Sequence, residues 1–67
     1  MMSSIVDKLR SINIAIYEAQ RFIDKASHAK NRLENEPSAH ISGCKEVAAM
    51  KRTSLDLTRA LANLRRP

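Results

Sequence analysis

The sequence predicts an all-α protein, an antiparallel two-helix hairpin of coiled-coil type that assembles into a homo-oligomeric helical bundle. Two stretches carry apolar residues at alternating spacings of three and four, which is typical of coiled-coil helices, and a proline-containing segment separates them. The chain has 67 residues and one cysteine, so it cannot form an internal disulfide. Because so short a chain rarely builds a sufficient core alone, we expect another copy to supply the missing contacts.

The first predicted helix covers about residues 4–34. One row along it is apolar except for a lysine and consists of Ile5, Leu9, Ile12, Ile16, Ala19, Ile23, Ala26, Lys30 and Leu33. Alternation at Ile12, Ile14 and Ile16 would also suit a strand, but the longer helical period outweighs that interpretation. Pro37 disfavours helical geometry in the residue before it, so the helix is expected to end there.

A loop over about residues 35–41 leads to the second predicted helix, about residues 42–65, and residues 1–67 form a single domain. The apolar row of the second helix is Val47, Met50, Ser54, Leu57, Leu61 and Leu64. In an antiparallel register the numbers of facing residues sum to 76 or 77, which places Ile16 opposite Leu61 and Ala26 opposite Met50. Large side chains then tend to meet small ones, as interdigitating layers require.

Several apolar residues of the first helix have no partner in this hairpin. Ile5 and Leu9 would face positions beyond the second helix, while Ile14 and Phe22 lie beside the apolar row. Their cover must come from another chain, since two helices alone enclose no core. The predicted oligomer interface is therefore Ile5, Leu9, Ile14 and Phe22.

The second helix carries the functional signal. The net charge is +5, and residues 38–67 hold 6 basic and 2 acidic side chains. Basic residues recur every seven positions, about 10.5 Å apart along the helix, at Lys45, Arg52, Arg59 and Arg66. A second row of Lys51, Thr58 and Arg65 flanks the apolar strip Ala48, Leu55 and Ala62. A solvated face would show similar charges, but the unbroken row and the preference for arginine favour recognition of phosphate.

The predicted anion-binding residues are Lys45, Lys51, Arg52, Thr58, Arg59, Arg65, Arg66 and Tyr17. Tyr17 lies off the apolar row near Arg21. An oligomer contact is its first interpretation, and a stacking platform for a base is the second.

Catalysis is not expected, and no catalytic residue, metal or cofactor is predicted. Gly43 is the sole glycine, which rules out a glycine-rich phosphate loop. Cys44 has no histidine or aspartate at motif spacing and is expected to be a packed thiol. Near the loop, the potential ligands His40, Cys44, Glu34 and Glu36 do not have the spacing of a structural zinc site.

Composition also bears on location. The hydrophobic content of 43% is too high for a disordered tail, and the longest apolar runs are too short to cross a bilayer. The first residues show no basic segment followed by an apolar one, so we expect no secretion signal, no membrane partner and a reducing cytoplasm.

Two segments resemble a family of small phage proteins. The stretch Arg32-Leu33-Glu34-Asn35-Glu36-Pro37-Ser38-Ala39 and the later Leu57-Thr58-Arg59-Ala60-Leu61 are similar to the hairpin of the phage anti-CBASS cyclic-oligonucleotide sponges, over about residues 32–62. The resemblance implies a non-enzymatic oligomer that sequesters cyclic nucleotide signals of bacterial immunity in the host cytoplasm. It carries over Thr58 and Arg59 as ligand residues. The base-stacking aromatic of that family has no counterpart here, and Tyr17 is the substitute that chemistry suggests.

Three functions therefore stand as expectations. The first is a sponge for a cyclic oligonucleotide or another phosphate-bearing ligand. The second is a nucleic-acid-binding hairpin, whose affinity would fall steeply with salt. The third is an inhibitor or adaptor that binds an acidic host protein through the basic rows and the strip between them.

Overall fold

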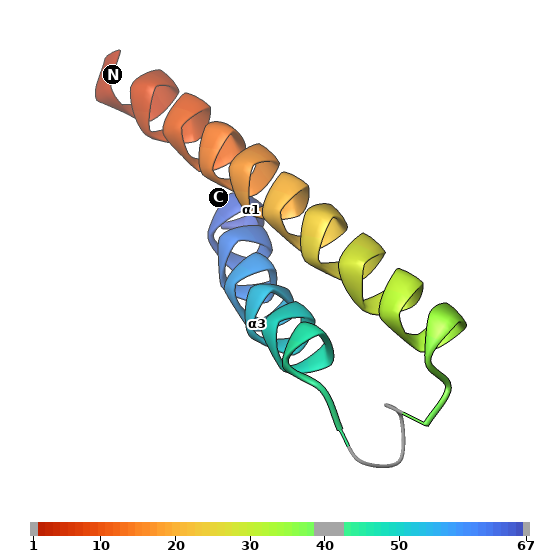
Figure 1. Cartoon of the computed structure of the whole chain (residues 1–67). Helices are drawn as coiled ribbons and strands as arrows, with labels where there is room; N and C mark the ends of the chain where they lie inside the picture. The colour runs from red at the N-terminus through yellow and green to blue at the C-terminus, as the bar shows by residue number, and fades with distance from the viewer. Residues whose placement is uncertain (1, 39–42, 67) are drawn as a thin grey trace.

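The hairpin consists of two antiparallel helices joined at one end (Figure 1). A computed structural model describes residues 2–38 and 43–66, and all regular structure within them is α-helical. Helix α1 is Met2–Asn35 and helix α3 is Lys45–Arg65. The molecule is a rod of 54 × 14 × 13 Å. The prediction of an all-α two-helix hairpin is confirmed.

The helix ends follow from local hydrogen bonding and from one glycine. At the end of α1 the Glu36 amide donates to the Arg32 carbonyl at 2.8 Å, just before Pro37. Helix α3 begins at Lys45, later than the expected start near residue 42, which lies outside the described residues. Gly43 has φ +82°, a left-handed conformation that a right-handed helix cannot include, and Cys44 is extended at the N-cap.

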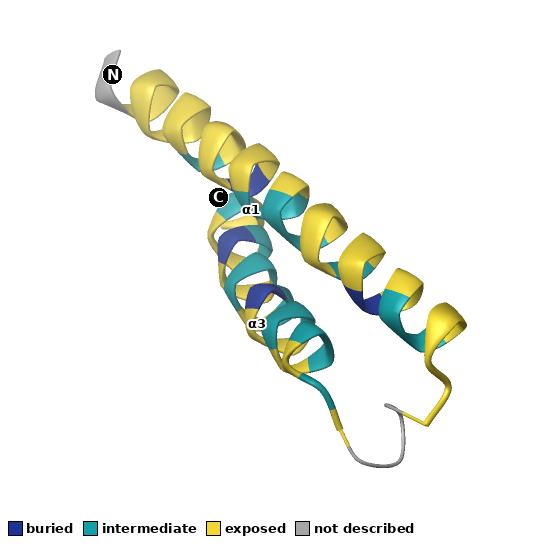
Figure 2. Ribbon diagram, viewed as in Figure 1, coloured by how far each residue is buried: buried dark blue, intermediate teal, exposed yellow. Residues whose placement is uncertain are grey.

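Small side chains hold the two helices together. Among the described residues the buried ones are Ala15 and Ala29 on α1 and Thr53 and Ala60 on α3, and Figure 2 colours the buried segments of both helices dark blue. Ala29 is 1% exposed and Thr53 is 3% exposed. Because alanine and threonine project little from the backbone, the helices can approach closely along this line.

The contact face of α1 differs from the predicted one. The predicted row includes Ile12, Ile16 and Ile23, which are all exposed, and Ile23 is 62% exposed. The observed face combines Ala15, Phe22 and Ala29 with three residues of the predicted row that are half-buried, Ala19, Ala26 and Leu33. The face is therefore rotated around the helix by about 50°, half the angle between successive residues. Phe22, predicted at an oligomer interface, is half-buried on this face and so lies toward α3.

The register between the helices agrees with the antiparallel prediction. Arg21 Nη1 lies 3.5 Å from Asp56 Oδ2, and Arg32 Nη1 lies 3.6 Å from Glu46 Oε2. These pairs have residue numbers that sum to 77 and 78, close to the expected 76 or 77. The prediction therefore placed the helices correctly along their axes and misjudged their rotation about those axes.

Helix α1 is much longer than α3, so its N-terminal part projects past the end of the hairpin (Figure 1). At 34 and 21 residues the helices are about 51 and 32 Å long. Ile5 and Leu9 lie on this projecting part and are 64% and 55% exposed. The expectation that these two residues lack cover within the chain is confirmed.

Neither of the two helices offers an apolar stretch of the length and hydrophobicity that crossing a membrane requires, within the residues that were described.

Candidate anion-binding surface

The predicted basic row lies along the outer side of α3. Lys45, Arg52, Arg59 and Arg66 are all exposed, and so are Lys51 and Arg65 in the neighbouring row. Leu55, between the rows, is 62% exposed. Seven-residue spacing turns a row by only about 20° per heptad, so the four cations of the first row share one side of the helix.

Thr58 is exposed, but its hydroxyl proton is already used. The Oγ1 atom of Thr58 donates to the Ser54 carbonyl at 2.9 Å, one turn earlier in the same helix. A phosphate oxygen needs a donor, and the Thr58 hydroxyl would have to leave this bond to provide one. The role that the resemblance implies for Thr58 therefore requires its hydroxyl to give up this hydrogen bond.

The structure brings half of the basic row together with cations of the other helix. A groove of about 320 Å³ lies along the line between α1 and α3. Arg21 and Lys25 of α1 line one side, and Lys45 and Arg52 of α3 line the other. Ala48, Ala49 and the buried Thr53 form the remaining lining. We call this site the cationic groove; it combines four positive charges with a small, largely apolar floor.

Arg21 is held in place at the edge of the cationic groove. Its Nη1 donates to Glu18 at 2.9 and 3.2 Å and reaches Asp56 Oδ2 at 3.5 Å. The hydrogen bond to Glu18 and the charge of that carboxylate raise the pKa of the Arg21 guanidinium above its ordinary value, with smaller contributions from Tyr17 and Asp56. Because these contacts all use Nη1, the rest of the five-donor guanidinium fork is not engaged by them.

Tyr17 extends the site by an aromatic ring. The guanidinium carbon of Arg21 lies 5.9 Å from the centroid of the Tyr17 ring, within the range of a cation–π contact. The ring is 61% exposed, so a flat ligand group can reach it. Tyr17 also lines a shallow hollow of about 480 Å³ on the outer side of α1, together with Val6, Leu9, Arg10, Asn13 and Ile14. Both interpretations of Tyr17 are compatible with its exposure.

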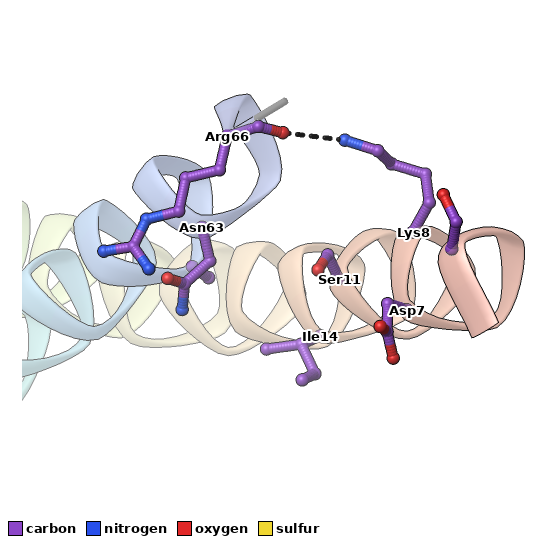
Figure 3. A pocket seen from close by; sticks show the side chains of 8 residues that line it. Asp7, Lys8, Ser11, Ile14, Asn63 and Arg66 are labelled. Atoms are coloured by element: carbon purple, nitrogen blue, oxygen red, sulfur yellow. Dashed lines mark hydrogen bonds between the residues drawn. The ribbon is translucent and has the colours of Figure 1, made fainter. Parts of the chain in front are cut away.

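Arg66 lies apart from the cationic groove, at the C-terminal end of α3. There the Lys8 ammonium donates to the carbonyl of Arg66 at 3.1 Å (Figure 3). It also donates to the carbonyl of Leu64 at 3.2 Å. A lysine at this position satisfies terminal carbonyls and complements the negative end of the helix dipole. The cavity beside it has a volume of about 600 Å³ and also receives Asp7, whose carboxyl group makes it less suited to an anion.

The segment that carries the phage resemblance has a structural task at the other end of the hairpin. Arg32 Nε lies 3.1 Å from Glu36 Oε2, and Arg32 Nη1 reaches Glu46 on α3. The pair with Glu46 links the end of α1 to the beginning of α3, whereas the pair with Glu36 lies at the end of α1. Arg32 therefore has a role in closing the hairpin whether or not a ligand binds.

Metal-ligand side chains do not gather in the described part of the chain. Within residues 2–38 and 43–66, no three histidine, cysteine, aspartate or glutamate side chains are grouped to hold an ion. His28 Nε2 lies 3.4 Å from Asp24, and Cys44 is half-buried. His40 lies outside the described residues.

The α1 side of the cationic groove was missing from the sequence prediction. Arg21 and Lys25 are four residues apart and so share a helix face, which was a readable signal. It could be connected to Lys45 and Arg52 only once the rotation of α1 was known.

Comparison of this chain with protein families, with curated proteins and with solved structures found no match.

Proposed function

We propose that this chain is a non-enzymatic protein that binds a phosphate-bearing ligand, a cyclic oligonucleotide, within an assembly of several hairpins. The observation that supports the proposal is the cationic groove, where Arg21, Lys25, Lys45 and Arg52 converge from two helices. If the chain is phage-encoded, it would sequester the ligand in the host cytoplasm.

The chemistry of the cationic groove suits such a ligand. Arginine forms paired hydrogen bonds with phosphate oxygens, and lysine adds a mobile point charge. A cyclic oligonucleotide presents at least two phosphates close together, with flat bases around them. Two helices that each contribute two cations match the clustered phosphates, and the Tyr17 ring beside Arg21 offers a surface for a base.

Calorimetry against a panel of cyclic di- and trinucleotides tests the proposal. The double variant Lys45→Gln, Arg52→Gln should weaken binding at least about 100-fold, because each charge-assisted hydrogen bond contributes about 1.5–3 kcal/mol. The variant Arg59→Gln, Arg65→Gln removes the same charge outside the groove and should change affinity no more than about threefold. Absence of heat with every ligand at micromolar protein would refute the proposal. If affinity falls only in the Arg59→Gln, Arg65→Gln variant, the ligand binds at Arg59 and not in the cationic groove, as the resemblance implies.

A nucleic-acid strand is the second candidate, favoured by the straight row that continues from the groove to Arg59 and Arg66. A linear polyanion would use all four cations of this row, whereas a compact ligand would use two. Binding of a strand should weaken by about one power of salt concentration per phosphate contacted. A gel shift that survives high salt, or no shift at all, would contradict this candidate.

A further inference from the structure

The face opposite the cationic groove is apolar. Around α1, Ile16 and Ile23 lie about 170° from Arg21 and Lys25. Around α3, Ser54 and Leu61 lie about 180° from Lys45 and Arg52. Because antiparallel helices turn in opposite senses when viewed from one end, these residues reach the same side of the hairpin. We call it the apolar face.

The apolar face continues onto the projecting end of α1 and has no charge there. Its α1 members are Ile5, Leu9, Ile12, Ile16, Ala19 and Ile23, and the five large ones among them are exposed. The first charged residue on this row is Lys30. Interface cores are depleted in charged residues in the same way, whereas solvated helix faces are not.

The accessible surface area of the chain indicates how much surface a partner could bury. A monomeric globular protein of 7.5 kDa exposes about 4,250 Å², whereas this chain exposes 5485 Å². The excess is about 1,200 Å² per chain, and two copies that hid it would bury about 2,400 Å² together. That area falls within the range of obligate homodimers.

We propose that the apolar face binds a second copy of this chain, with the two α1 helices antiparallel about a two-fold axis near residue 14. Successive α1 members are four, three, four, three and four residues apart, and this series of spacings is the same in both chain directions. Two antiparallel α1 helices can therefore align so that the numbers of facing residues sum to 28. Every member then faces another member, namely Ile5 with Ile23, Leu9 with Ala19, and Ile12 with Ile16. A two-fold dimer has this self-complementary interface.

This arrangement also places the projecting part of α1. Residues 4–12 of one copy lie beside residues 16–24 of the other copy, where that copy's α3 also contributes Ser54, Leu57 and Leu61. Each projecting end becomes the third helix packed on its neighbour. Lys30 falls beyond the paired region. A parallel pair in register would instead bring two Lys30 side chains together.

The inference rests on the proposed function only for the premise that hairpins associate. The two faces are on opposite sides, so the dimer leaves the cationic groove open. Cross-linking reports on the interface with no ligand present, and calorimetry reports on the groove.

Cysteine cross-linking in a Cys44→Ser background tests the orientation. The double variant Ile5→Cys, Ile23→Cys should form a disulfide-linked dimer, because positions 5 and 23 face each other. Each single variant should stay unlinked, since like positions are separated by about 27 Å and a disulfide needs Cα atoms within about 7 Å. Efficient linkage of Ile5→Cys alone would indicate a parallel pair and overturn the proposal, and so would absence of linkage in all three.

A pair of charge variants tests the face itself. Ile16→Asp places a carboxylate in the proposed interface twice per dimer and should raise the dimer dissociation constant at least about 100-fold in sedimentation equilibrium. Leu55→Asp is the matched control, since Leu55 is also exposed but lies on the outer side of α3. Equal dissociation constants for the two variants would contradict the proposed interface. Circular dichroism establishes that both remain helical.

Discussion

At the scale of single residues, the contact between the helices depends on small side chains. Ala29 is 1% exposed and Ala60 is 4% exposed, so neither site has space for a larger group. Interiors are close-packed, and added methylene groups force backbone shifts or strained rotamers. Stability should therefore respond to enlargement at these alanines more than to changes at the exposed isoleucines.

Ala29→Leu should destabilise the hairpin by about 1–3 kcal/mol, because the added atoms must separate the helices. The matched control is Ala62→Leu, at an exposed position of α3. Leucine and alanine have similar helix propensities, so the control should change stability by less than about 0.5 kcal/mol. Urea unfolding followed by circular dichroism measures both. An Ala29→Leu variant as stable as the control would contradict the close contact at this site.

At the scale of helices, the sequence was sufficient for their existence, direction and register, because these follow from apolar periodicity and from Pro37. The sequence was not sufficient to predict how α1 is rotated about its own axis. A row of isoleucines and a row of small residues run side by side on α1, and both have helical spacing. Periodicity cannot decide which row meets α3 and which remains for another chain. The same ambiguity hid the α1 side of the cationic groove, since Arg21 and Lys25 approach Lys45 only in the observed rotation.

The start of α3 gives a prediction at this scale. Gly43→Ala should destabilise the hairpin by about 1 kcal/mol, because φ +82° is costly for a residue with a Cβ atom. A Cβ atom there meets nothing within 4 Å, so the cost is one of backbone conformation alone. The variant Gly43→Asn should lose less stability, since asparagine tolerates the left-handed backbone conformation better than alanine does. Thermal unfolding compares the variants, and a ranking with alanine more stable than asparagine would contradict the expected conformation.

At the scale of the whole molecule, the two proposed tasks fall on opposite faces of the hairpin. The apolar face has the area and the symmetric spacing for a second copy, and the cationic groove has the charge for clustered phosphates. Association stabilises a fold by mass action, so the melting temperature should rise with protein concentration. The rod alone leaves more surface in water than a globular monomer of this mass does.

Native mass spectrometry of the protein mixed with a cyclic dinucleotide tests the central claim that one hairpin joins self-association to ligand binding. The expected species have masses that are even multiples of the 7.5 kDa chain, with ligand retained on them. Loss of the ligand in the Lys45→Gln, Arg52→Gln variant, with the subunit number unchanged, would separate the two faces as proposed. A 7.5 kDa monomer with no retained nucleotide would contradict both self-association and ligand binding.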